Sequence, residues 1–417
     1  MKPGDFNLAD PDTFEAGPPS DYYAVLRREA PVHWNPPPES DPPSDPDDPI
    51  AIRRGFYALT KHADIVHVSC NPEIFSARVG SNLLSDPDDE PLEAMQSMLL
   101  NMDPPDHVKY RRIFQRGFTR RMVAKLEPKI RAHAERVVDG IAHKGECDFV
   151  RDLAIELPLI LICELMGVPE RDRGKIFEWS NALCGFDDPE MLESREAQMR
   201  AAAEVQEYST QLAAQKRAHP DDTLISKYVH SEVNGQAITD FQLNNFFILL
   251  CVAGSETTRN ATTHGMRLLC EHPEQRELLL SDLERHLPGA IEEILRFSPP
   301  VMVVRRTAME DTEIRGVQIE MGDKLGLYYG AANRDEEVFE DPERFDITRS
   351  SNPHLTSGIG EHYCLGANLA RMQLHCIFAE VLTRFPDMRV SAPPRRQRSA
   401  LFDGIKEMRV RYTPEPA

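Results

Sequence analysis

The sequence HLTSGIGEHYCLGANLAR, at residues 354–371, is the most informative stretch of this chain. Cys364 lies near its centre, with His362 two residues before it and Gly358 and Gly366 among the three glycines around it. Glycines this close together predict tight turns, because glycine adopts a positive φ freely. A helical pattern follows, so the sulfur is predicted at a helix N-terminus, where N–H groups and the helix dipole stabilise a thiolate. Such a thiolate is a metal ligand or a nucleophile; the alternative is a buried structural cysteine in a glycine turn.

Length and composition indicate one large domain. The chain has 417 residues, of which 41% are hydrophobic. That is long against the usual ~150 residues per domain, yet large single-domain folds reach this size. Residues 35–49 are rich in Pro and Asp, a composition typical of a surface loop or a disordered insertion. We therefore expect a polar N-terminal segment over residues 1–49 and a single domain over residues 50–417.

Charge, hydropathy and cysteine spacing exclude several classes of protein. The net charge of −20 argues against nucleic acid and anionic membrane surfaces as partners. No run approaches the ~18 consecutive apolar residues of a membrane span, and the N-terminus lacks the apolar core of a signal peptide. We therefore expect a soluble, cytoplasmic protein with no membrane span. The eight cysteines include no CxxC pair, which argues against zinc ribbons, and no CxxCH, which excludes covalently attached c-type haem.

The longest helical pattern runs over residues 239–271 and opens with a possible capping box at Thr239. Its centre, AGSETT at residues 253–258, is unusual for a helix interior. Gly and Thr are weak helix formers, and a Glu beside apolar residues is costly to bury. Two interpretations remain open. One is a kinked core helix whose Glu256 reaches solvent, and the other is a functional acid and alcohol pair, Glu256 and Thr257.

Two further helical patterns carry charges. DPPDHVKYR at residues 103–111 predicts a helix with His107 and Arg111 four residues apart, on one face. Its other cations, and those just after it, are Lys109, Arg112, Arg116, Arg120, Arg121 and Lys125. An ordinary solvated face is the simple alternative for this cluster. Glu293 and Arg296 form an E-x-x-R pair, a spacing that is common on helices and weak evidence alone.

The spacing Gly358-x-Gly360-x-His362-x-Cys364-x-Gly366 resembles the haem-ligand loop of the cytochrome P450 monooxygenases. The AGSETT, DPPDHVKYR and ExxR motifs occur in the order of that family, and the likeness covers roughly residues 50–412. The resemblance implies a mainly α fold with a smaller β region, in which one long central helix lies over haem b. One departure is Ser357, where the family usually has Phe, and this leaves the shielding of the sulfur open.

The resemblance implies a role for each motif residue. In this family the Cys thiolate is the axial iron ligand and favours O–O cleavage, which makes Cys364 the expected metal ligand. His107, Arg111 and Arg306 are expected to bind the haem propionates, with Arg305 as the neighbouring alternative to Arg306. Other expected cofactor contacts are His362, Ala253, Gly358 and Gly366. Behind the ligand loop, a structural charge network is expected among Glu293, Arg296 and Arg344 of the PERF sequence.

The same resemblance implies a hydroxylation that uses dioxygen and two electrons. Glu256 and Thr257 would deliver protons beside a local distortion of the long helix. The sequence between the motifs is similar to that of family members that hydroxylate sterols, terpenoids and branched lipid chains, so an apolar small molecule is the expected substrate. Its pocket is expected to involve the segment 79–98, the 180s and Leu401. The principal pocket candidates are Val252, Ala253, Val301, Val304 and Phe402.

The chain carries no Gly-x-Gly-x-x-Gly after a strand, so its electrons are expected from a separate ferredoxin and ferredoxin reductase. The basic cluster near Arg112 would then face an acidic electron donor. Two alternatives belong to other classes: a peroxide-driven peroxygenase, and a non-catalytic haem or gas sensor. Glu256 and Thr257 argue against the peroxygenase, since the similar peroxide-using members lack the acid–alcohol pair.

Overall fold

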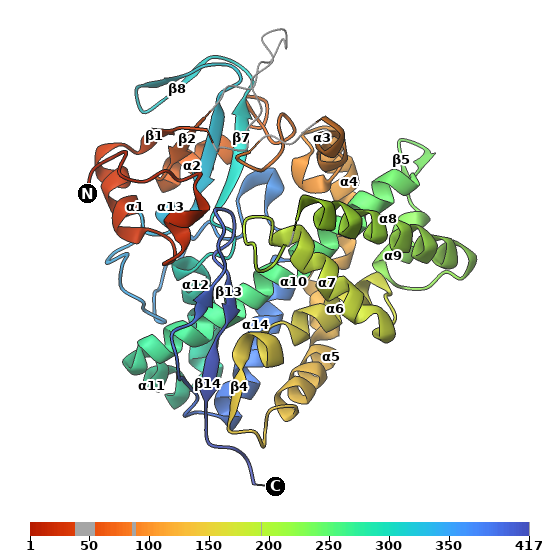
Figure 1. Ribbon diagram of the computed structural model, residues 1–417, viewed down its shortest axis with the longest axis vertical. Coiled ribbons are helices and arrows are strands. Elements are labelled where there is room, and N and C mark those ends of the chain that lie inside the picture. Colours follow the sequence, from red (N-terminus) through yellow and green to blue (C-terminus); the bar gives the residue numbers. More distant parts are fainter. Residues whose placement is uncertain (38–54, 86–88, 193, 417) are drawn as a thin grey trace.

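A computed structural model describes residues 1–37, 55–85, 89–192 and 194–416, with the side chains of residues 89–91 and 116 left out. The chain forms a helical layer beside a smaller β region, as the resemblance implied (Figure 1). The α-helices are α1 (Ser20–Glu29), α2 (His62–Cys70), α3 (Asp89–Gln96), α4 (Asp106–Phe114), α5 (Arg120–Asp139), α6 (Glu156–Met166), α7 (Arg173–Cys184), α8 (Arg195–Ala218), α9 (Leu224–Val229), α10 (Asp240–Glu271), α11 (Pro273–Ser281), α12 (Leu283–Phe297), α13 (Tyr329–Ala332) and α14 (Ala367–Arg384). Short 3-10 turns lie at Pro11–Phe14, Leu99–Asn101, Gln115–Gly117, Glu170–Asp172 and Gly360–His362, and a π-helical turn at Val150–Ala154.

The largest sheet has five strands in the order β1-β2-β10-β7-β3. Strands β2 and β10 run parallel, and the other neighbours run antiparallel. The strands of this sheet are β1 (Val32–Asn35), β2 (Phe56–Leu59), β3 (Phe75–Ser76), β7 (Val303–Ala308) and β10 (Lys324–Tyr328). The smaller sheets are formed by β4 (Glu146–Asp148), β5 (Glu232–Val233), β6 (Gln236–Ala237), β8 (Thr312–Ile314), β9 (Val317–Ile319), β11 (Arg389–Val390), β12 (Arg395–Arg396), β13 (Ile405–Glu407) and β14 (Arg409–Arg411).

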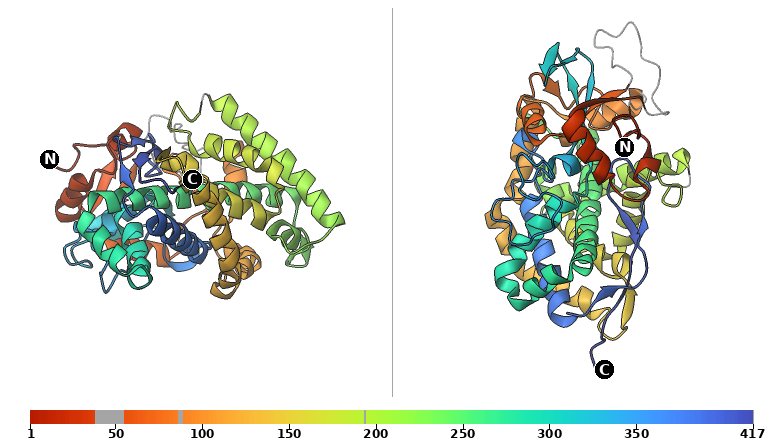
Figure 2. Two further views of the ribbon diagram at one scale, coloured as in Figure 1. Left: turned by 90° about the horizontal axis from the view of Figure 1, so that it is seen from below. Right: turned by 90° about the vertical axis from the view of Figure 1, so that its left-hand side faces the viewer.

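Helix α10 is the central element of the helical layer. Its N-terminus has the predicted capping box, in which the Thr239 side chain accepts from Gln242 N–H and the Gln242 side chain accepts from Thr239 N–H. Its 32 residues, at 1.5 Å each, extend about 48 Å. It contacts α6, α7, α8, α12 and α14, so residues at its centre are enclosed from several sides (Figures 1 and 2).

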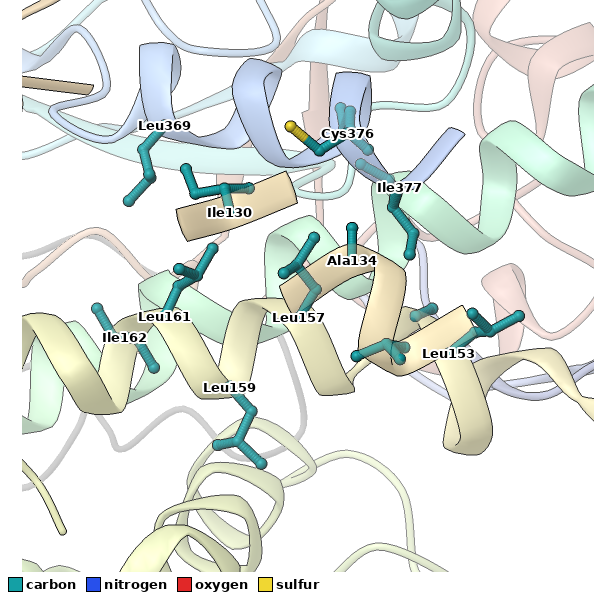
Figure 3. Packing of buried hydrophobic residues seen from close by; sticks show 14 of the residues in the cluster. Ile130, Ala134, Leu153, Leu157, Leu159, Leu161, Ile162, Leu369, Cys376 and Ile377 are labelled. Carbon is teal, nitrogen blue, oxygen red and sulfur yellow. The ribbon is translucent and has the colours of Figure 1, made fainter. Parts of the chain in front are cut away.

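The main hydrophobic core lies between α5, α6 and α14 (Figure 3). Ile130 and Ala134 of α5 face Leu157 and Leu161 of α6, while Ile377 comes from α14, the helix that follows the cysteine loop. All five side chains are buried. The helix that begins behind Cys364 is therefore anchored in the core and gives the loop a rigid base.

The N-terminal segment belongs to the sheet side of the molecule (Figure 2). Leu8 and Phe14 are buried, and β1 pairs with β2. Most of the Pro/Asp-rich stretch, and with it the expected domain boundary at residue 50, lies outside the described residues. Asn35, which the sequence interpretation assigned to that loop, instead ends β1 and is buried.

Two local predictions had different outcomes. The dipeptide Asn234-Gly235 predicts a tight hairpin turn, and this is confirmed because it joins β5 and β6 in an antiparallel hairpin. Pro72, Pro87 and Pro91 in the sequence predict that no helix forms over residues 73–98, and the expectation of an irregular segment there was wrong, because it contains β3 and α3. Pro91 had been interpreted as a helix breaker, yet it lies in the first turn of α3, where proline costs no hydrogen bond. None of the described helices has the length and apolarity needed to cross a membrane.

Candidate active site

The Cys364 loop has the predicted geometry. Gly358 and Gly360 have φ of 69° and 72°, which favours glycine, and Cys364 N donates to the Ser357 carbonyl at 2.8 Å. Cys364 as a residue is exposed to solvent, but many protein atoms lie around its sulfur. Burial raises the pKa of the Cys364 thiol. The N–H groups of Gly366 and Ala367 at the start of α14 act in the opposite direction, as the sequence argument expected.

Two histidines from distant segments meet beside this loop. The rings of His107, on α4, and His362 lie 4.3 Å apart between centroids. His107 Nδ1 and His362 Nε2 are buried without a hydrogen-bond partner among the described residues. Burial, with the nearby positive charges of Arg111 and Arg306, lowers the pKa of His107 to about 4 and that of His362 to about 2. The pair is therefore neutral at pH 7, with two buried ring nitrogens available to an incoming acceptor or donor.

The strand β7 separates Arg305 from Arg306, because successive side chains point to opposite faces. Arg306 is the arginine whose charge acts on His107 and His362. Arg305 is directed toward the residues near 80, where it donates to the Leu83 carbonyl at 3.3 Å, and a Cβ on Gly80 would lie 2.0 Å from its Nη2. The geometry thus brings Arg306, and not Arg305, to the histidine pair.

Arg111 has a more direct contact with the cysteine loop than the sequence suggested. Its Nη2 donates to the Tyr363 carbonyl at 2.5 Å, one residue before the sulfur. Its charge also acts on the Cys364 thiol. Arg111 therefore braces the loop, in addition to lying next to His107.

The charge network behind the loop requires one correction. Arg296 is fully buried and donates to both Glu293 oxygens at 2.8 Å, as expected. Arg344 offers only its carbonyl, which accepts from Arg296 at 3.0 Å. The second guanidinium is that of Arg349, whose Nε lies 3.3 Å from Glu293 Oε2, and Asn352 adds a bond at 3.1 Å. The prediction of an Arg344 ion pair was wrong because the chain turns after residue 344 and aims its backbone at the pair.

A second charge cluster, which sequence reasoning missed, ties the loop to α12. Arg371 on α14 donates to both oxygens of Glu292 at 2.6 and 2.8 Å, and His354 lies 3.1 Å from the same carboxylate. Burial acts to raise the pKa of Glu292, but hydrogen bonds from His354 and Arg371 outweigh it and hold the pKa at about 2. Glu292 directly precedes Glu293, the glutamate of the ExxR motif, and this was the sequence signal that could have indicated a second charge cluster.

The centre of α10 contains a buried ion pair. Glu256 is 1% exposed and bonds to Arg259 and, at 3.0 Å, to Asn260. The interpretation in which Glu256 reaches solvent was therefore wrong. Arg259 continues to the Asn181 side chain of α7 at 3.3 Å. The sequence contained the signal, since Arg259 and Asn260 lie three and four residues after Glu256, the spacing of side chains on one helix face.

Thr257 lies on a different face of α10 from Glu256. Its hydroxyl donates to the Ala253 carbonyl at 3.0 Å, and Ala253 is exposed. Gly254 allows α6 to approach, because a Cβ there would lie 2.6 Å from Ile162 Cγ1. The expected local distortion is not evident, since α10 is α-helical from Asp240 to Glu271.

The expected pocket residues come from three elements. Val301 forms an antiparallel bridge with Phe402, and Met302 N donates to the Leu401 carbonyl at 2.8 Å. The structure thus joins two of the candidates that are about a hundred residues apart in the chain. Val252 and Val304 are half-buried, on α10 and β7. Part of the segment 79–98 that was expected to line the pocket lies outside the described residues.

These observations fit one prosthetic group. Cys364 lies at the start of α14, in the loop that also contains His362, and two histidine ring nitrogens without a hydrogen-bond partner among the described residues lie beside it, with the Arg306 charge acting on both rings. A model of the cytochrome P450 family matches residues 189–403, slightly more than half of the chain. The chain belongs to the cytochrome P450 family, the haem-thiolate monooxygenases, and its cofactor is haem b.

Individual relatives match over nearly the whole chain. A steroid C26-monooxygenase of Rhodococcus jostii is 40% identical over 98% of this chain and 85% of its own length. A methyl-branched lipid omega-hydroxylase of Mycobacterium tuberculosis is 40% identical over 94% of this chain and 90% of its own. A solved Mycobacterium marinum cytochrome P450 in complex with pseudoionone superposes with a TM-score of 0.90 at 36% identity, with 99% of each chain covered. The chain is thus similar to P450 enzymes that hydroxylate steroids and branched lipids.

Proposed function

We propose that this monooxygenase hydroxylates a steroid or a methyl-branched lipid, with Cys364 as the residue that would hold the haem iron. The observation that carries the proposal is the convergence of the Cys364 sulfur with the unpaired nitrogens of His107 and His362 and the Arg306 guanidinium. Carboxylates are the partners that cationic guanidinium groups and ring N–H donors favour. Haem propionates supply two such groups, and the relatives' substrates suggest the class of molecule.

The residues of the cysteine side hold the cofactor. His107, Arg111 and Arg306 would bind the propionates, His362 would be a further cofactor contact, and Arg111 also holds the loop. When bound, the haem iron activates dioxygen for insertion into a C–H bond. Gly358 and Gly366, which have no side chain, would leave room for the haem beside the loop, and Ala253 would leave room on the α10 side. Neutral histidines suit this site because their charge would be costly to bury.

Thr257 and Glu256 manage protons on the α10 side. In the structure the Thr257 hydroxyl donates to the Ala253 carbonyl. Rotation about its Cα–Cβ bond would present this proton to the place where dioxygen binds. Glu256, whose Oε1 is held by Arg259 and Asn260, is the acidic member of the pair that the family resemblance implies. Val252, Ala253, Val301, Val304 and Phe402 form an apolar wall that excludes water and orients the substrate.

The electron source is a ferredoxin with its reductase, and the protein acts in the cytoplasm. A hollow of about 880 Å³ lies between α4, the start of α5 and α9, with Lys109, Arg112, Lys227 and His230 among its lining residues. In a chain of net charge −20, a local group of cations of this kind attracts an acidic partner. We therefore place the donor against Arg112 and the neighbouring cysteine loop.

The decisive test compares two cysteines. Reduced, carbon-monoxide-treated wild type should absorb near ~450 nm, as thiolate-ligated haem does. Cys364→His should lose this band, whereas Cys270→Ala, at a half-buried cysteine of α10, should keep it. A band that survives in Cys364→His would remove the ligand assignment.

The substrate class requires a separate measurement. Titration of the wild type with steroids, branched fatty acids and terpenoids should give spin-state shifts at the lowest concentrations for steroids or branched lipids. Turnover should need ferredoxin, its reductase and NADPH. Product formed with hydrogen peroxide alone would favour a peroxygenase. A haem protein that binds none of these substrates and forms no product under either condition would favour a sensor.

A further inference from the structure

Asp403 lies directly after the pocket candidate Phe402, in the turn between β12 and β13, and is 4% exposed. His264 Nε2 lies 3.0 Å from its carbonyl oxygen and 3.3 Å from its carboxylate Oδ1. Arg396 donates to the same Oδ1 at 2.8 Å, and Asp403 N donates to the Pro300 carbonyl at 3.0 Å. Backbone and side chain of this one residue are thus both held, immediately beside the expected substrate wall.

His264 is equally fixed on the other side. It is fully buried on α10, and its Nδ1 accepts from Arg267 Nε at 3.3 Å, so its Nε2 carries the proton that Asp403 accepts. Arg267 is itself bound to Glu271 at 2.6 Å and to Ser298 Oγ at 3.3 Å. Burial acts to raise the pKa of Asp403, but His264, Arg396 and Arg267 hold it well below its usual value. A buried carboxylate with these partners stays in one position.

The position of His264 along α10 gives this contact a meaning for the pocket. His264 comes seven residues after Thr257, two helical turns and about 10 Å along the same face. The helix that carries the candidate proton-delivering hydroxyl is therefore also the support of the Phe402 turn. On its far side the same turn is bound to the loop after α7, where Asp187 Oδ2 accepts from Ala400 N at 3.2 Å.

We propose that His264 and Asp403 form a buried clamp that fixes Phe402 relative to Thr257 and so sets how far an apolar substrate chain enters the pocket. Both are positioning residues, since they act through Phe402 and its bridge to Val301. The proposal rests on the proposed function in one respect, namely that Phe402 lines the substrate pocket. Without His264, the turn would lose its contact with α10 and would be held only by its remaining bonds, among them those to Arg396, Pro300 and Asp187.

The test uses two azoles on the holoenzyme. Imidazole binds the haem iron and reaches little of the pocket, whereas 1-dodecylimidazole binds the iron and extends a C12 chain along the pocket wall. His264→Leu removes the donor, and we expect about tenfold weaker binding of 1-dodecylimidazole with imidazole affinity unchanged, because only the C12 chain contacts the wall that the turn carries; a tenfold change corresponds to about 1.4 kcal/mol. His264→Gln places an amide N–H near the former Nε2 and should restore the affinity.

A second readout is independent of the haem. Hydrogen exchange of the amides of residues 401–405 should become about tenfold faster in His264→Leu and stay slow in His264→Gln, because the clamp restrains this turn. The matched control is His133→Leu, at a buried histidine of α5 that bonds to Glu164 of α6 at 3.1 Å. It should change neither readout.

Several results would overturn the proposal. Exchange at residues 401–405 that is as slow in His264→Leu as in the wild type would show that the clamp does not hold the turn. An unchanged ratio of the two azole affinities despite faster exchange would show that the turn does not shape the pocket. If His264→Leu yields no folded holoenzyme, Asp403→Asn replaces it, and wild-type exchange in that variant counts against the clamp. Loss of imidazole binding itself would point to failure of the haem assignment instead.

Discussion

The two sides of the candidate haem site are built by different forces. On the Cys364 side, α12 and α14 are joined to the loop by charged groups that are buried or half-buried, with Glu292, Glu293 and Arg296 at the centre. On the Thr257 side, the surface of α10 offers Ala253, a half-buried valine and a hydroxyl bound to its own helix. The ligand side is therefore specified by directional contacts that admit one geometry. The substrate side is specified by size and packing, which admit variation.

The largest expected effect separates chemistry from structure on the Thr257 side. Thr257→Ala should reduce product per NADPH consumed by about a hundredfold, because general acid steps typically contribute ~10²–10⁴-fold. Substrate affinity and thermal stability should stay near those of the wild type. Thr262→Ala is the matched control, since its hydroxyl makes the same bond one turn back, to Thr258, away from the site. Normal coupling in Thr257→Ala would sink the proton role.

The next effect tests the corrected charge network on the Cys364 side. Arg349→Ala should destabilise the protein by about 1–3 kcal/mol, because Glu293 stays buried with one guanidinium fewer. Arg344→Ala should cost at most about 0.5 kcal/mol, since Arg344 contributes a carbonyl that the variant retains. Chemical denaturation of both holoenzymes measures the difference. Equal losses would restore Arg344 as a side-chain partner.

A smaller effect concerns the cation-lined hollow at Arg112, where we place the electron donor. Arg112→Glu should slow the first electron transfer from ferredoxin about tenfold at low salt, because charged partners are steered by local cations. Added salt should narrow the gap between variant and wild type, and substrate affinity should not change. Lys175→Glu, at an exposed lysine of α7, provides a charge-matched control. Stopped-flow reduction that is the same in all three proteins would place the donor elsewhere.

The smallest effect is a shift in potential at Ser357. A hydroxyl or a nearby water stabilises negative charge on the sulfur and favours ferrous haem, whereas an aromatic ring shields it. Ser357→Phe should therefore make the potential more negative by about 30 mV, roughly a threefold change in a one-electron equilibrium. Spectroelectrochemical titration under the same substrate load checks it. A shift to positive values would mean that Ser357 does not tune the iron in this way.

The sequence was sufficient to predict local geometry where one short motif contains both the functional residue and the residues that fix its conformation. The Cys364 loop and the Thr239 capping box are of this kind, because glycine conformation and hydrogen bonds between residues at most seven apart define them. The partner of Glu293 was different. Arg344 and Arg349 lie in one irregular segment, and only the path of the backbone decides which side chain turns inward. Phe402 and Asp403 show the same limit, since their contacts join segments that no spacing rule connects.

The order of strands in the five-stranded sheet has a consequence in time. Tyr57 of β2 pairs with Leu325 of β10, the central strand of this sheet. The ribosome therefore synthesises β10 about 270 residues after its neighbour β2. At synthesis rates of about 5–20 residues per second, β2 waits roughly 15 to 50 seconds on the ribosome with an open edge. Proteolysis of nascent chains stalled before and after residue 328 would reveal this interval. An exposed strand edge can pair with another chain, such as a nascent chain on a neighbouring ribosome of the same mRNA. During this interval the chain depends on its helical layer, or on a chaperone, to cover the edge of β2.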